Sequence, residues 1–267
     1  MGHTRLGIIP KTQKWRDIVN GLSSSGEIGV QPPEFYNINS LISQTLEATQ
    51  NYLGEAKNDL GLRYTFYLLA KVALASRDEG WVSSLQKLGI NIREGDSLVE
   101  FTTEFQTAID DYLSRNLHSS DISEIAQQAA GEALTNLVAP KAITLFGAGT
   151  EELQSAVKDY STKNGFSRLG QKFFGIFVAR YINFYISRVT AAQLGNPRLS
   201  HVGELSRFND ELQLHCEQSA KIVHDFCGEW YSKTQYIEGI NLNNSSRFLA
   251  IALKKLQAEF ELQEADL

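Results

Sequence analysis

The stretch from Phe173 to Val189 constrains the fold more than any other part of the chain, because it has the length of a helix and no continuous polar face. A helix that is apolar on nearly every side is usually surrounded by other helices. Arg180 and Asn183, near its middle, argue against a membrane-spanning segment. We therefore expect a buried central helix that packs through Phe173, Phe174, Ile176, Phe177, Val178, Tyr181, Ile182, Phe184, Tyr185 and Ile186.

Most of the remaining chain shows the apolar spacing of amphipathic helices. Apolar residues recur at intervals of three and four in 38–53, 60–75 and 203–235, and again in a last helix after the turn at 237–246. The long helix over 203–235 is expected to break, if at all, near Gly228. Residues 142–153 alone resemble a strand, and they are too few to establish a sheet. The sequence therefore predicts an all-α protein, a single multi-helix domain of about nine or ten helices around the aromatic-rich helix.

Capping residues and helix breakers place several of the expected helix ends. Ser97 and Glu100 fit a capping box, in which each side chain accepts a hydrogen bond from a backbone N–H of the first turn. The helix that they start is expected to cover 98–115. Asp121 is the expected cap of the next helix, and Pro140 its expected end.

The N-terminal region differs in composition from the rest of the chain. A short amphipathic helix after Pro10 precedes a stretch rich in Gly, Ser and Pro at 21–35, which is typical of a loop or linker. We predict an N-terminal amphipathic helix and linker over 1–30 and a helical domain over 31–267. A subdivision of that domain near residue 140 is the alternative.

The N-terminal helix carries a small basic cluster beside a tryptophan, which consists of Arg5, Lys11, Lys14, Trp15 and Arg16. Basic side chains attract phosphate and an indole ring stacks on bases, so this cluster is a candidate contact for an anion, a nucleic acid or a partner. A short run of charges is more often a solvated helix face. On that interpretation Trp15 anchors the helix to the core.

The segment at 215–227 holds His215, Cys216, His224 and Cys227, which are residue types that bind metals. The two cysteines are eleven residues apart, or about 16 Å along a straight helix, so they do not share an ion unless the helix breaks between them. His224 and Cys227 have the spacing of a reactive dyad. Both cysteines lie on or beside an apolar stripe, which favours core packing. We predict no metal site, no disulfide and no cofactor.

Two further patterns have a chemical and a structural interpretation. GAGT at 147–150 resembles a phosphate-binding turn at a helix start, but the following glutamates oppose an anion, and a structural turn with Thr150 as the helix cap is favoured. Arg180 and Arg188 lie in the aromatic helix, where each needs a carboxylate, a ring or a cavity. A structural ion pair or a side chain that reaches solvent is favoured over a functional pocket.

Charge and targeting signals restrict the class of protein further. A net charge of -6 argues against a generally basic surface of the kind that binds duplex nucleic acid, although local contacts stay open. The N-terminus lacks the apolar core of a secretory signal, and no run of 18 uninterrupted apolar residues occurs. With only two cysteines, these features predict a cytoplasmic protein without a stable membrane span.

No enzymatic motif emerges, so the expected function is that of a non-catalytic helical interaction protein, an adaptor or a subunit of a larger cytoplasmic assembly. A protein partner or a second copy of the chain would then bind it. The first alternative is an enzyme or nucleic-acid-processing component whose site assembles from Arg180, Arg188, His201 and His224. The second is a membrane-active effector that exposes the aromatic helix.

Overall fold

The computed structural model describes residues 53–142, 149–192 and 202–265 of the chain. These residues form nine α-helices and one short 3-10 helix, with no strand among them. The prediction of an all-α fold with about nine or ten helices is therefore confirmed.

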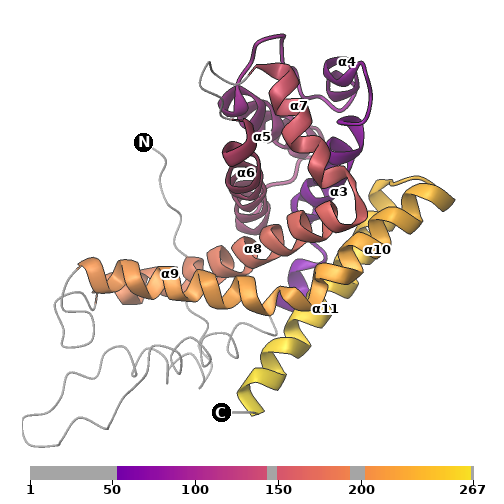
Figure 1. The fold of residues 1–267 in the computed structure, drawn as a ribbon. Coiled ribbons are helices and arrows are strands. Elements are labelled where there is room, and N and C mark those ends of the chain that lie inside the picture. Colours follow the sequence, from indigo (N-terminus) through magenta and orange to yellow (C-terminus); the bar gives the residue numbers. More distant parts are fainter. Residues whose placement is uncertain (1–52, 143–148, 193–201, 266–267) are drawn as a thin grey trace, which may run out of the picture.

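The helices form two groups on either side of α8 (Figure 1). One group contains α3, α4, α5, α6 and α7, and the other contains α9, α10 and α11. In chain order the elements are α3 (Leu60–Ala75), α4 (Trp81–Gln86), α5 (Leu98–Arg115), α6 (Asp121–Ala142), α7 (Thr150–Lys158), the 3-10 helix η1 (Asp159–Ser161), α8 (Lys163–Ala192), α9 (Val202–Ser219), α10 (Lys221–Ile237) and α11 (Leu242–Ala265).

The core is an aromatic cluster centred on Phe66 of α3. The Phe66 ring contacts rings from three other helices, at centroid distances of 5.4–6.1 Å. Such tilted and offset pairs add to the stabilisation from apolar burial. The surrounding rings are Phe166, Phe173 and Phe174 of α8, Trp230 of α10 and Phe248 of α11. The predicted central position of the aromatic-rich helix is confirmed, because α8 packs against α6, α9 and α10.

The capping signals located one helix start correctly and misplaced two others by one residue. The capping box of Ser97 and Glu100 is present at the start of α5, which covers the predicted residues. In α6, however, the Ser120 hydroxyl accepts the N–H of Ser123, so Ser120 and not Asp121 occupies the cap position. Thr150 is the first residue of α7, and Gly149 precedes it as the cap. The Ser120 hydroxyl satisfies a first-turn N–H group of α6, whereas Gly149 has no side chain to do so and its own N–H is bonded by Glu152. Sequence alone does not distinguish these arrangements.

Two helix ends also differ from the expectation. Pro140 lies inside α6, which continues to Ala142. Proline disrupts the turn that precedes it, yet its own φ is helical, and the helix ends two residues later. The expected single helix over 203–235 is two helices, α9 and α10, which meet at Ala220 and not near Gly228.

Glycines on α8 and α10 allow close packing rather than ending helices. Gly165 lies in the first turn of α8, where a Cβ atom would collide with the Asp159 carbonyl oxygen. A Cβ atom at Gly228 would approach the Lys163 carbonyl oxygen to 2.4 Å. Gly228 thus allows α10 to lie against the start of α8, and Gly165 allows that start to lie against η1.

The predicted N-terminal helix and linker over 1–30 lie outside the described residues. Residue 140 itself lies in α6, which packs against both α7 and α8. The subdivision near residue 140 stays a prediction. Among the described residues, none of the helices combines the length and apolar character that crossing a membrane requires.

Candidate functional site

The basic cluster predicted as an anion or partner contact lies outside the described residues. It comprises Arg5, Lys11, Lys14, Trp15 and Arg16, and its role stays a prediction.

The two cysteines are both completely buried, in α9 and α10. Burial raises the pKa of each thiol far above its ordinary value, which keeps both thiols protonated and unreactive. Nδ1 of His224 lies 2.8 Å from a carboxylate oxygen of Asp225, its neighbour in the chain. Within the described ranges no group of His, Cys, Asp and Glu side chains is arranged to hold a metal. Core packing therefore describes the two cysteines, whereas His224 lies against a carboxylate at the surface.

Arg180 takes part in a polar network that joins three helices. Its Nε and Nη2 atoms donate to a carboxylate oxygen of Glu132 on α6, at 2.9 and 2.6 Å. The amide of Gln213 on α9 donates to the other Glu132 oxygen and to Glu217, which also accepts from Lys172 of α8 at 2.6 Å. The positive charges of Arg180 and Lys172 are thus balanced by the two carboxylates where α6, α8 and α9 meet. This arrangement corresponds to the structural ion pair that the sequence favoured.

The hypothetical site of Arg180, Arg188, His201 and His224 lies only partly among the described residues. The side chain of Arg188 and the whole of His201 lie outside the described residues. Gly170 of α8 abuts Cys227, one turn from His224. Arg180 lies ten residues further along α8, about 15 Å by helical rise. The geometry thus does not bring Arg180 and His224 together, and a site that includes Arg188 or His201 stays a prediction.

The glycine turn before α7 is already occupied by the chain's own groups. Glu152 accepts the N–H of Gly149 at 3.1 Å. The Thr150 hydroxyl accepts the N–H of Gly95 at 2.7 Å and donates to the Arg93 carbonyl at 3.2 Å. The described part of this turn therefore fixes the 93–95 loop, as expected of a structural turn.

A buried carboxylate that the sequence did not single out, Asp59, lies at the start of α3. It accepts the N–H of Leu62 at 2.8 Å and the hydroxyl of Ser123 at 2.9 Å. Its second oxygen binds Nε2 of His118 at 3.0 Å and the Ser120 hydroxyl. Both serines donate to the carboxylate and not to the imidazole, so this set lacks the serine-to-histidine contact of a nucleophilic triad. It links the 116–120 loop to the cap of α3.

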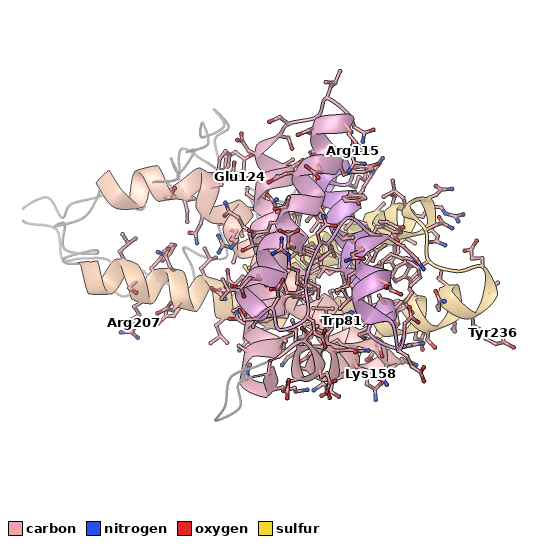
Figure 2. The ribbon with its side chains drawn as sticks, turned by 90° about the horizontal axis from the view of Figure 1, so that it is seen from above. Trp81, Arg115, Glu124, Lys158, Arg207 and Tyr236 are labelled. Carbon is pink, nitrogen blue, oxygen red and sulfur yellow. The ribbon has the colours of Figure 1, made fainter. Side chains whose placement is uncertain are left out.

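Among the side chains that the structure describes, the most exposed consecutive pair of large apolar residues lies at the end of α10, before the turn into α11. Tyr236 is 92% exposed and Ile237 is 76% exposed, and the two residues are consecutive at the end of α10. Figure 2 shows Tyr236 at one extremity of the molecule, opposite the end that carries Arg207. We call Tyr236 and Ile237 the tip pair. Adjacent exposed apolar groups on a projecting turn are typical of a protein contact.

Hydrogen bonds hold this turn in one conformation. Gly239 has a φ of 73°, a left-handed value that glycine adopts without strain. Asn241 and Asn244 exchange side-chain-to-backbone hydrogen bonds at 2.9 and 3.0 Å, and Asn244 also donates to the Gly239 carbonyl at 2.9 Å. The tip pair is therefore presented by an ordered turn, which lowers the entropy lost on binding. The sequence indicated the turn but not the exposure of the pair.

The fold and these sites define a helical protein without a recognised catalytic centre among its described residues. Comparisons with models of protein families, with curated protein sequences and with solved structures gave no match.

Proposed function

We propose that this chain is a non-catalytic helical interaction protein, an adaptor or a subunit of a larger cytoplasmic assembly, and that it binds a partner protein through the tip pair. The observation that carries the proposal is the exposure of Tyr236 and Ile237 on an ordered, projecting turn. Tyrosine is among the residues that contribute most at protein interfaces, because its ring buries a large area and its hydroxyl still hydrogen-bonds.

The partner surface that fits this turn is a shallow apolar pocket with a polar rim. Glu238 follows the pair and is also exposed, and Lys233 lies one turn earlier on α10 in an ion pair with Glu229. A polar rim around two apolar side chains is the usual anatomy of a protein interface. A second copy of the chain is the alternative occupant.

The experiment is purification of the tagged full-length chain from its native cell, with the double variant Tyr236→Ser/Ile237→Ser beside it. We expect a protein at fixed stoichiometry with the native chain and its loss, by about tenfold or more, with the double variant. Val99→Ser is the matched control, since Val99 is also exposed but lies on α5. It should retain the partner.

Light scattering of the isolated chain distinguishes the two occupants. If the native chain is a dimer and the double variant is a monomer, the molecule that binds the tip pair is a second copy of the chain and not another protein. Equal recovery of the partner with the native chain and the double variant would overturn the proposal, as would a monomer that purifies alone.

A further inference from the structure

An open hollow of about 540 Å³ lies where α3, the end of α5, the loop after α4 and the start of α11 meet. Three tyrosines and two cations line it: Tyr64 and Tyr67 of α3, Tyr112 and Arg115 of α5, and Lys87 after α4. Leu242, the first residue of α11, supplies an apolar wall. We call this hollow the tyrosine pocket. Its volume is in the range of small-molecule sites and exceeds the space that a single anion needs.

The three phenol groups gather at one place in the tyrosine pocket. The rings of Tyr64 and Tyr112 stack in parallel with centroids 3.7 Å apart, and the Tyr67 centroid lies 5.8 Å from that of Tyr64. Burial, reinforced by the neighbouring Tyr67 and Tyr112, raises the pKa of Tyr64, and burial also raises the pKa of Tyr67. The hydroxyls of Tyr64 and Tyr67 therefore stay protonated near neutral pH and are available as hydrogen-bond donors.

The charge of the tyrosine pocket is opposite to that of the whole chain. Its lining includes Lys87 and Arg115 and no carboxylate, whereas the chain has a net charge of -6. Nε of Arg115 donates to the Asp111 carbonyl at 3.0 Å, which orients the guanidinium group and leaves its terminal nitrogens for a ligand. In the described part of the chain, no ion pair involves Lys87 or Arg115. An acidic protein thus keeps two cations together in a hollow.

We propose that the tyrosine pocket binds a small organic phosphate monoester. Arg115 and Lys87 bind the phosphate with the phenol hydroxyls, and the organic group packs against Leu242 and the tyrosine rings. Phosphate fits better than carboxylate because its three terminal oxygens accept from a guanidinium, an ammonium and several hydroxyls together. This proposal is independent of partner binding through the tip pair, so an experiment that overturns one of the two proposals leaves the other standing.

Calorimetric titration of the full-length chain with phenyl phosphate tests the ligand class. We expect saturable binding that weakens as salt is raised, because the contact is largely electrostatic. Inorganic phosphate should bind more weakly, since it leaves the apolar wall empty, and phenol should not bind measurably. Equal affinity for inorganic and phenyl phosphate would overturn the claim that the ligand is an organic ester. The absence of saturable binding of either compound would overturn the claim that the tyrosine pocket binds an anion.

Two variants test the residues. Arg115→Gln should weaken phenyl phosphate binding by about tenfold or more, because it removes charge-assisted hydrogen bonds, and Lys87→Gln should do the same through a different element. Arg207→Gln is the matched control, because Arg207 is an exposed arginine at the far end of the molecule (Figure 2), and it should leave the affinity unchanged. Unaltered affinity in both pocket variants would overturn the proposal. Circular dichroism confirms that each variant is folded.

Discussion

The two sides of α3 carry aromatic clusters of opposite character. On one side Phe66 lies inside a closed cluster of phenylalanine and tryptophan rings from α8, α10 and α11. On the other, Tyr64 and Tyr67 share an open hollow with Tyr112. Phe66 is buried, whereas all three tyrosines are half-buried.

The difference between the two clusters is one of polarity more than of size. The closed cluster stabilises the fold by apolar burial, which requires no directed polar group. The open cluster keeps hydroxyls and cations at its edge, and such groups are not needed for packing. A single helix therefore separates a face that holds the fold together from a face that is free to recognise a ligand.

The largest effect should come from truncation in the closed cluster. Phe66→Ala removes a buried ring that contacts five others, and we expect the free energy of unfolding to fall by about 3–5 kcal/mol. Tyr64→Ala, two residues away, should lower it by less because that ring is half exposed. Denaturant unfolding of the full-length variants measures both. Equal losses would contradict the distinction between a closed and an open face.

A second variant tests how tightly α10 packs on α8 beside the closed cluster. A Cβ atom at Gly170 would lie 2.2 Å from the Cys227 sulfur, so Gly170→Ala should lower the free energy of unfolding by about 1–3 kcal/mol. In a Cys227→Ala background the same change should cost much less, because the sulfur is gone. Denaturant unfolding measures the free energies of all three variants. If the losses from Gly170→Ala and Cys227→Ala simply add in the double variant, α8 and α10 move apart to accommodate the alanine and the predicted clash with the sulfur is absent.

Local signals in the sequence predicted much of this fold, and contacts between distant segments explain what they missed. The capping box at Ser97 and Glu100 is a local device, and it is present as expected. The break between α9 and α10 at Ala220 follows no breaker residue, and both helices pack against α8. The expected break at Gly228 failed because that glycine serves close packing.

The candidate sites were less predictable than the helices. Tyr64 and Tyr67 are three residues apart, a spacing that places them on one helix face. Tyr112 and Lys87 join them only through the tertiary fold, so no motif marks the tyrosine pocket. The exposure of Tyr236 likewise depends on where the α10–α11 turn projects. The Arg180 ion pair was anticipated because a charge among aromatic residues requires a partner.

A smaller, stabilising effect is expected on the open side, at the loop after α5. Leu117 has a φ of 51° and its side chain is 96% exposed. The N–H groups of Leu117 and His118 bond to the carbonyls of Ser114 and Leu113, which is the Schellman arrangement that favours glycine at the left-handed position. Leu117→Gly should raise the free energy of unfolding by about 1 kcal/mol.

Leu117→Ala separates backbone strain from the loss of an exposed apolar side chain, because alanine also disfavours a positive φ. Thermal unfolding of both variants provides the measurement. A gain in melting temperature for alanine as large as for glycine would place the effect in the side chain and not in the backbone.

The smallest effect concerns the dependence of stability on pH, and it follows from the protonated phenols of the open cluster. Burial raises the pKa of Tyr64 above its ordinary value, so the folded chain retains this proton at a pH where the unfolded chain has lost it. Its contribution to stability is fully present below about pH 10 and is lost as the pH rises through the folded pKa. Tyr64→Phe should therefore flatten the decline in the free energy of unfolding above about pH 10, measured by denaturant unfolding across that range. If Tyr64→Phe gave the slope of the native chain, Tyr64 would hold its proton no more tightly in the folded chain than in the unfolded chain, and the burial of its hydroxyl in the open cluster would be contradicted.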